Sequence, residues 1–393
     1  MTPSCRRLGV VTVSRSDYGH LRPVLDAVRQ APDLELLLFV AGMHLLPEFG
    51  STVRDIEADG FDIAERVAMH AEGDSPEAIA ASTGRGVAGF GRAFARRRPD
   101  LVVVLGDRFE MLAAAVAALP LALPVAHIHG GEVSEGAMDN QIRHAITKLA
   151  HLHFASAPEH ARRIARMGEE GWRIHTVGGP GLDRIAALEP LPRPALASEL
   201  GLPSAGPWVL VTFHPVTLEY GDTVSHAEEL LAALEKTEGS LVITYPNADT
   251  SSRLIIERLE EFAGRHPGRC RLVRNLGERR YLSVLRHADV MVGNSSSGLI
   301  EAPSFGLPVV NIGSRQRGRL RGANVIDVEP ARDEILRGVE TALTPEFRRR
   351  AQAAANPYGD GHAAPRIVEV LRRVSLDARL VQKRFADAGG ETQ

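Results

Sequence analysis

The sequence predicts an α/β protein built from two doubly wound, mostly parallel sheets. Short runs of Val, Leu and Ile recur along the chain, and helix-like segments separate them. The runs are apolar on both faces rather than at alternating positions, which is typical of parallel strands covered by helices on both sides. At 393 residues the chain is too long for one ordinary core, so two domains are expected.

The candidate strands form two series with a break between them. The first series is LGVVTVS (8–14), LELLLFVAG (34–42), DLVVVLGD (100–107), PVAHIHG (124–130), LHFASA (152–157) and RIHTVGG (173–179). The second series is WVLVTFH (208–214), SLVITYPN (240–247), CRLVRNL (270–276), DVMVGN (289–294), PVVNIG (308–313) and NVIDV (324–328). The break, residues 188–207, is rich in Pro and Ala and weak in periodicity. We therefore predict a linker at 188–207 between Rossmann-like domains at 1–187 and 208–360.

Composition excludes several classes of function. The net charge is −3 and no long block is dominated by basic residues, which argues against a nucleic-acid or membrane-surface partner. The two cysteines, Cys5 and Cys270, are far apart and fit a reducing compartment. The most apolar window, 111–128, is interrupted by Pro120 and Pro124, so a helix followed by a buried strand is expected there. With no signal-peptide core after Met1, we expect a cytoplasmic protein.

Polar side chains stand at the carboxyl end of nearly every predicted strand. In open parallel sheets this edge is where ligands bind. The residues that the pattern places there include Arg15, Asp107, Glu132, His214, Asn247, Asn294, Ser295 and Arg315. A single polar residue would only mark the start of a loop. So many of them predict a ligand site, with ordinary loop chemistry as the competing interpretation.

The stretch SSSGLIEA, at 295–302, predicts a helix that begins directly after a strand. A helix amino terminus carries partial positive charge and free N–H donors, so it can bind phosphate. Glu301 would then reach a ribose diol. The competing interpretation is a plain serine cap with a solvated Glu301. Arg315, within GSRQRGRLRG (313–322), favours the phosphate site.

Other motifs are weaker. GRGVAG (84–89) matches a dinucleotide fingerprint, but it lies inside a helical pattern that starts at Ser75 and Pro76 rather than after a strand. His127, His129 and Glu132 could form a zinc site, although no further ligand group accompanies them, so no metal is expected. Glu132, Asp107 and Asp139 could instead shuttle protons at a sugar carbon. The competing role of Asp139 is a helix cap or an ion pair with Arg143.

A series of motifs runs in order through nearly the whole chain. They are SRSDYG (14–19), GMHLLPEFG (42–50), GDRFEMLAAA (106–115), HIHGGEVSEGAMDNQIRHAITKL (127–149), YPNADTSSR (245–253), GNSSSGLIEAPSFGLPVVNIGSRQRGR (293–319) and NPYGDGHAAPRI (356–367). Together they resemble the hydrolysing UDP-N-acetylglucosamine 2-epimerases of bacterial sialic-acid and legionaminic-acid pathways. This chain has SRSDYG and DNQIRH where the family more often has Thr-Arg-Ala-Asp-Tyr-Gly and Asp-Glu-Ser-Ile-Arg-His.

The resemblance implies a GT-B-like fold with the active site in the cleft between the domains, and a last helix (361–376) that returns to the first domain. It implies a catalytic set and a substrate-binding set. The catalytic set is Asp107, Glu132, Asp139 and His214. The substrate-binding set is Arg15, Arg143, Asn247, Leu276, Tyr281, Ser295, Ser296, Ser297, Glu301 and Arg315. Within it, Ser295–Ser297 match the diphosphate-binding turn, Glu301 the ribose ligand, and the loop of Leu276 and Tyr281 the base.

The implied reaction converts UDP-N-acetylglucosamine to UDP and N-acetylmannosamine through a glycal. It needs neither metal nor other cofactor, and a homodimer or homotetramer is expected by analogy. One alternative is the same reaction on a UDP- or GDP-linked 2,4-diacetamido-2,4,6-trideoxyglucose. A second is a GT-B glycosyltransferase, which would require an acceptor. A non-catalytic nucleotide-sugar-binding protein would not need the three carboxylates.

Overall fold

The computed structural model describes residues 5–47, 50–71, 75–133, 138–216, 221–246 and 252–387. The chain divides into two compact units. The first unit comprises Met1–Arg184 together with Tyr358–Gln393, and the second comprises Ile185–Pro357. The active site expected in the cleft between the domains stays a prediction.

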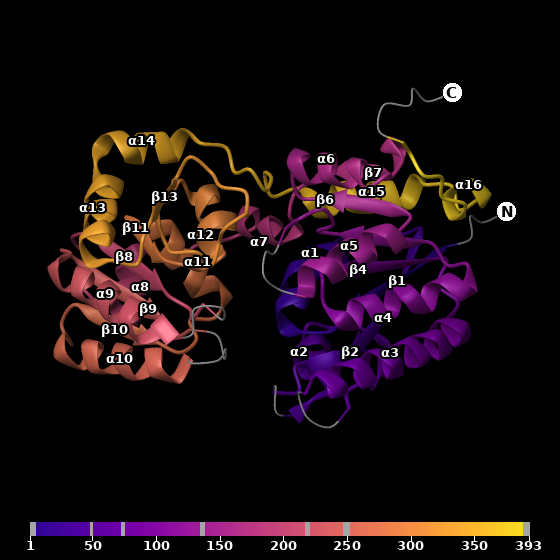
Figure 1. The fold of residues 1–393 in the computed structure, drawn as a ribbon, viewed down its shortest axis with the longest axis horizontal. Coiled ribbons are helices and arrows are strands. Elements are labelled where there is room, and N and C mark those ends of the chain that lie inside the picture. The colour runs from indigo at the N-terminus through magenta and orange to yellow at the C-terminus, as the bar shows by residue number, and fades with distance from the viewer. Residues whose placement is uncertain are drawn as a thin grey trace. The chain divides into compact units, whose positions relative to one another are not determined.

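The first unit is a parallel sheet with helices on both faces (Figure 1). Its strand order is β3-β2-β1-β4-β5-β6-β7, the arrangement of a Rossmann fold. The strands are β1 (Arg6–Thr12), β2 (Leu34–Ala41), β3 (Ile63–Val67), β4 (Leu101–Leu105), β5 (Val125–Ile128), β6 (Leu152–Ala155) and β7 (Ile174–Thr176). The helices are α1 (Arg15–Gln30), α2 (Val53–Ala58), α3 (Pro76–Arg97), α4 (Phe109–Ala118), α5 (Met138–Leu149), α6 (Pro158–Arg166), α15 (Ala363–Arg373) and α16 (Ala378–Val381).

The second unit repeats the same arrangement with the order β10-β9-β8-β11-β12-β13. Its strands are β8 (Trp208–Thr212), β9 (Ser240–Thr244), β10 (Cys270–Val273), β11 (Val290–Gly293), β12 (Val309–Ile312) and β13 (Val325–Val328). Its helices are α8 (Arg193–Leu200), α9 (Thr223–Lys236), α10 (Ser252–Arg265), α11 (Glu278–His287), α12 (Ser297–Ile300), α13 (Arg332–Leu343) and α14 (Pro345–Ala353). Helix α7 (Asp183–Ala186) contains the boundary between the units.

The central strands explain why the sequence predicted this class. Every residue of β4, β5 and β8 is buried, and every pairing between described strands is parallel, as between β1 and β4 or between β8 and β11. The predicted class of two doubly wound α/β units is confirmed. The GRGVAG pattern lies within α3, whose amino-terminal residues are capped by Ser75, as its sequence context indicated.

Two features differ from the sequence-based expectation. Residues 188–207 were expected to be a linker, but they contain α8, whose Leu196, Ala197 and Leu200 belong to a core cluster of the second unit. Strand β3 was not expected. It lies at the edge of its sheet with only Val67 buried, so its sequence lacks the continuous apolar run that marks the inner strands.

The carboxyl-terminal segment belongs to the first unit, where Figure 1 draws α15 and α16 in yellow among its indigo and magenta elements. Ile367 and Leu371 of α15 and Leu380 of α16 are buried in one of its two core clusters. Arg173, which is fully buried, donates to the backbone oxygens of Leu380 (2.8 Å) and Arg379 (2.8 Å). The apolar side chains of this segment and its backbone oxygens thus both attach it to the first unit.

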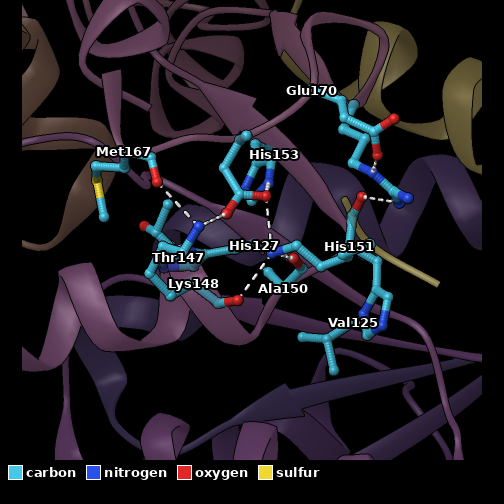
Figure 2. A network of polar contacts seen from close by, with 12 residues as sticks. Val125, His127, Thr147, Lys148, Ala150, His151, His153, Met167 and Glu170 are labelled. Atoms are coloured by element: carbon cyan, nitrogen blue, oxygen red, sulfur yellow. Dashed lines mark hydrogen bonds and ion pairs between the residues drawn. The ribbon is translucent and has the colours of Figure 1, made fainter. Parts of the chain in front are cut away.

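A buried polar network lies beside this attachment (Figure 2). Glu169, only 2% exposed, pairs with Lys148 Nζ (2.5 Å), Lys383 Nζ (2.7 Å) and His153 Nε2 (3.0 Å). Lys383 also donates to the backbone oxygen of Ala150 (2.6 Å). The carboxylate therefore joins α5, β6 and the carboxyl-terminal segment. In the part of the chain that the structure describes, no helix is long and apolar enough to cross a membrane.

Candidate active site

The turn after β1 is held by a buried carboxylate. Asp17 accepts hydrogen bonds from Thr12 Oγ1 (2.7 Å), Val13 N (3.0 Å) and Ser14 N (2.5 Å). Ser14 caps α1, and the two side chains form a reciprocal capping box. Asp17 therefore fixes the backbone of this turn, and Arg15, the first residue of α1, is left exposed at the edge of the sheet.

Arg143 of α5 connects the predicted acids of the first unit. Its side chain is 7% exposed and pairs with Asp107, which follows β4. Its NH1 atom donates to the backbone oxygen of His129 (2.9 Å) and lies 3.6 Å from Glu132 Oε2. A guanidinium can hold several oxygens in fixed positions through its planar set of donors, so Arg143 arranges both carboxylates.

Asp139 lies in the first turn of α5. Burial raises its pKa, and the nearby charge of Asp107 raises it further, against the opposing charges of Arg108 and Arg143. A raised pKa keeps the proton on a carboxyl group at higher pH than usual, which suits a proton donor. The structure thus places Asp139 near Asp107 and Arg143, and the acid–base and ion-pair roles of Asp139 stay predictions.

Glu132 is surrounded by donors. Its Oε1 atom accepts from His129 Nδ1 (2.6 Å) and Ser156 Oγ (2.6 Å), and His160 Nδ1 lies 3.9 Å away. Burial alone would raise its pKa, but its interactions with His129, Arg143 and His160, including the His129 hydrogen bond, hold it well below the usual value. Glu132 is therefore ionised at neutral pH and acts as a hydrogen-bond acceptor.

The two histidines of HIHGGE have separate surroundings. His127 is fully buried, with Nε2 2.7 Å from the backbone oxygen of Gly106 and Nδ1 3.2 Å from Thr147 Oγ1. Burial lowers its pKa to about 3, so it is neutral. His129, just beyond β5, has φ +64°, in the left-handed region that residues other than glycine rarely adopt. Among the described residues, no group of three potential ligands could hold a metal ion.

Three residues of this cluster were not assigned to the site from the sequence. His129 was placed at the carboxyl end of its strand and weighed as a metal ligand but was not assigned to the site, and Ser156 and His160 were not considered. Ser156 follows β6 and His160 lies in α6, so chain folding rather than local sequence brings them to Glu132. The position of Ser156 at a strand end was the one available signal.

In the second unit, Asn294 holds the turn after β11 against the turn after β8. Its Oδ1 atom accepts from His214 N (2.7 Å), and its Nδ2 donates to the His214 backbone oxygen (2.8 Å). Its own backbone oxygen accepts from Arg315 NH1 (3.2 Å) and Gln316 Nε2 (2.8 Å). Residues from the ends of β8, β11 and β12 thus meet at the switch point of the sheet, where such folds bind ligands.

His214 and Arg315 are close in this arrangement. Burial lowers the pKa of His214 to about 3, and the charge of Arg315 contributes to the shift. His214 is therefore neutral, and Arg315 supplies the positive charge at this edge. Gln316, which is buried and holds the same turn, was not predicted from the sequence.

The serine turn differs from the expected helix start. Helix α12 has only four residues, Ser297–Ile300, and Ser296 precedes it without a side-chain capping bond. Instead, Ser295 Oγ accepts from Ser297 N (3.3 Å), and Tyr281 Oη donates to Ser297 Oγ (2.7 Å). A 3₁₀ turn, Ala302–Phe305, follows directly, because Pro303 removes a backbone donor.

The remaining predicted residues occupy different places. Glu301 ends α12 and lies near Tyr281, whose pKa is raised by burial and by the Glu301 charge. Leu276 is 5% exposed and packs in a core cluster of the second unit, so it supports the adjacent loop. Asn247 lies outside the described residues.

Comparison with known proteins identifies the class of this protein. The family profile described as UDP-N-acetylglucosamine 2-epimerase matches residues 26–372. The chain is 38% identical over 379 residues to the Legionella pneumophila UDP-N,N'-diacetylbacillosamine 2-epimerase (hydrolyzing), covering 96% of this chain and 98% of that protein. It is 35% identical over 386 residues to the Campylobacter jejuni GDP/UDP-N,N'-diacetylbacillosamine 2-epimerase (hydrolyzing), covering 98% and 100%.

The fold agrees with these relatives. The crystal structure of UDP-GlcNAc 2-epimerase from Neisseria meningitidis bound to UDP-GlcNAc matches with a TM-score of 0.80 at 17% identity, over 94% of this chain and 100% of that chain. This protein is thus a GT-B-like enzyme of the hydrolysing nucleotide-sugar 2-epimerase class. The chain belongs to the UDP-N-acetylglucosamine 2-epimerase family.

Proposed function

We propose that this enzyme hydrolyses a UDP-linked 2-acetamido sugar and inverts carbon 2, releasing UDP and the free 2-epimer. The observation that carries the proposal is the group of carboxylates around Arg143 in the first unit. Asp107 and Glu132 are both paired with this buried guanidinium, and Asp139 lies close enough to Asp107 and Arg143 for their charges to shift its pKa. Inversion at a carbon bearing one hydrogen needs removal and return of a proton on opposite faces, and therefore two such groups.

Among substrates, we place UDP-N,N'-diacetylbacillosamine first and UDP-N-acetylglucosamine second. The first is supported by the names of the Legionella pneumophila and Campylobacter jejuni relatives, which cover nearly the whole chain. The second, the substrate that the sequence motifs favoured, is supported by the Neisseria meningitidis UDP-N-acetylglucosamine 2-epimerase, which is 33% identical over 384 residues. Both sugars carry the 2-acetamido group beside the carbon that is inverted.

The second unit supplies the groups that suit a nucleotide diphosphate. Arg315, His214 and the turn at Ser295–Ser297 are suited to the phosphates. Glu301 is suited to the ribose hydroxyls, and the loop containing Tyr281 to the base. As the bond between carbon 1 and UDP breaks, charge grows on the diphosphate, so these donors stabilise the transition state more than the substrate.

The first unit supplies the proton transfers. Cleavage at carbon 1 makes the hydrogen on carbon 2 acidic, and its removal gives a glycal. Water then adds at carbon 1 while a proton reaches carbon 2 from the other face. We assign one transfer to Asp139 and the other to Glu132 together with its hydrogen-bond partner His129, with Asp107 orienting Arg143. No atom changes its net oxidation state, so the reaction itself requires no redox cofactor.

The first experiment is proton NMR of the purified enzyme with each nucleotide sugar in deuterated water. We expect UDP and a free 2-epimer that carries deuterium at carbon 2. The substrate that turns over with the larger kcat/KM decides between the two sugars. If neither nucleotide sugar reacts and sugar is transferred to an added acceptor instead, the glycosyltransferase alternative replaces this proposal.

A further inference from the structure

His129 and Glu132 form a tightly joined pair in the first unit. Their Nδ1 and Oε1 atoms are 2.6 Å apart, and their side chains are 14% and 17% exposed. An ionised carboxylate only accepts hydrogen bonds, and Glu132 is held in that form by its neighbours. Nδ1 of His129 must therefore carry the hydrogen of this bond. In neutral His129, Nε2 is then left with its lone pair.

Nε2 of His129 is buried and has no hydrogen-bond partner among the described residues. The backbone is strained at His129, since φ +64° is unfavourable for a residue with a Cβ. Strain of this kind persists where the surrounding structure over-determines it, and it is concentrated at active sites. The combination indicates a basic nitrogen kept ready for a ligand.

The groups that face this pair come from several elements. From α1, the His20 ring packs edge-on against the His129 ring, with centroids 5.8 Å apart. Burial lowers the pKa of His20 to about 3, with His129 and Arg184 contributing, so His20 adds no positive charge. From α5, Arg143 binds the His129 backbone oxygen and holds Asp107. From α6, His160 lies beside Glu132.

We propose that Glu132 acts through His129, and that His129 Nε2 is the atom that takes the proton from carbon 2 of the sugar. This inference rests on the proposed function and names the base of that reaction. His129 is the catalytic residue, whereas Glu132 is a positioning residue that fixes the tautomer and balances the imidazolium charge.

The electrons and protons of the step balance. The electron pair of the carbon 2–hydrogen bond forms the double bond between carbon 1 and carbon 2. The electron pair of the carbon 1–oxygen bond leaves with UDP. Nε2 receives the proton and later releases it to solvent. Asp139 then donates a proton to carbon 2 on the opposite face and recovers one from the water that adds at carbon 1. The sum is nucleotide sugar plus water giving UDP, the 2-epimer and one released proton.

The first test compares H129Q, E132Q and the double variant with the wild-type enzyme. We expect each single variant to lower kcat by about 10²–10⁴-fold with KM changed less than threefold. The double variant should be no slower than the slower single variant, because the two residues act as one unit. H266Q is the matched control, since His266 pairs with Glu235 at 2.9 Å in the second unit. Its activity should stay at the wild-type value.

Two further measurements separate chemistry from support of the fold. H129G tolerates the positive φ, and added imidazole should restore its activity at least tenfold, while E132Q should not respond. In E132Q the ¹⁵N signals of the His129 ring should show that its hydrogen is no longer held on Nδ1 alone, because the carboxylate that fixes the tautomer is gone. H129N, which also tolerates this backbone conformation, serves if H129G does not fold.

The proposal is overturned if H129Q or H129N keeps activity within threefold of wild type. It is also overturned if ¹⁵N NMR of the free protein, assigned by difference from H129Q, shows the hydrogen of His129 on Nε2. That measurement needs no substrate. Absence of hydrolytic epimerisation by the wild-type enzyme itself would instead refute the proposed function, so the two failures are distinct.

Discussion

At the scale of single residues, Asn294 shows how one amide can hold together the strand ends that we propose bind the nucleotide. It is fully buried and uses both halves of its amide on the backbone of His214. Its backbone oxygen also accepts hydrogen bonds from Arg315 and Gln316. Three strand ends are thus fixed relative to one another, and the positions of His214, Ser295 and Arg315 follow from that arrangement.

Replacement of Asn294 by Asp is expected to weaken UDP binding by about tenfold or more. The carboxylate still accepts from His214 N, but it has no donor for the His214 backbone oxygen, and two acceptors then face each other in a buried site. Leaving such a group unsatisfied costs about 1–3 kcal/mol. Isothermal titration with UDP measures the loss. Unchanged UDP affinity in a folded variant would contradict the role given to Asn294.

Asp139 is expected to act as an acid, so Asp139→Asn should abolish release of the 2-epimer while UDP binding stays within threefold of wild type. The amide keeps the shape of the side chain but cannot transfer a proton. Since burial raises the pKa of Asp139, activity that depends on its protonated form should fall as pH rises through that raised value. A kcat–pH profile of the wild-type enzyme checks this, and equal activity of the variant would refute it.

At the scale of elements, the sequence was most informative where burial is uniform. Strands β4, β5 and β8 are buried throughout, so their apolar runs were recognisable. Edge strand β3 is mostly half-exposed, and α8 begins among prolines. Their sequences therefore resemble loops, and tertiary packing decides their conformation. The same holds for Ser156 and His160, whose contact with Glu132 depends on how β5, β6 and α6 pack.

The backbone conformation at the last residue of β11 can be tested by mutation. Gly293 has φ +139°, and a Cβ at this position would lie 2.0 Å from the Thr212 backbone oxygen of the paired strand β8. Gly293→Ala should therefore destabilise the second unit by about 3 kcal/mol or more, through strain and overpacking together.

Gly264→Ala is the matched control. Gly264 lies exposed in α10 with no atom within 4 Å of an added Cβ, so stability should stay equal or rise by up to about 1 kcal/mol. Chemical denaturation of both variants measures the difference, and equal effects would contradict the steric argument.

At the scale of the whole molecule, two segments that are distant in the sequence form one compact unit. The chain forms the first sheet, then the second, and then returns with α15 and α16 to the first unit. Sequence periodicity indicates that such helices exist, but not which sheet they cover. Part of the attachment of α15 and α16 is apolar, through the buried side chains of Leu371 and Leu380. The other part is ionic, through Glu169, Lys148 and Lys383.

The ionic part of this attachment should make the first unit sensitive to acid. Burial alone would raise the pKa of Glu169, but its hydrogen bonds to His153, Lys148 and Lys383 lower that pKa to about 2. A carboxylate with a lowered pKa in the folded state contributes stability above its unfolded pKa, near 4.5, and loses it as pH falls toward 2. Glu169→Gln removes one member of a buried ion pair, which costs about 3–5 kcal/mol.

The measurement is denaturant unfolding of wild type and E169Q between pH 3 and pH 7, at each pH under identical salt. The free-energy difference between them should be constant above about pH 5 and should shrink below pH 4.5, since protonation removes the Glu169 charge from the wild-type protein too. Glu235→Gln is the control, because Glu235 is about half-exposed in its pair with His266 and should cost no more than about 1 kcal/mol. Proteolysis at the carboxyl terminus should also be faster in E169Q, since Lys383 loses its buried partner. A pH-independent difference between wild type and E169Q would show that Glu169 contributes packing rather than charge, and the attachment of the returning segment would then rest on Arg173 and the apolar contacts.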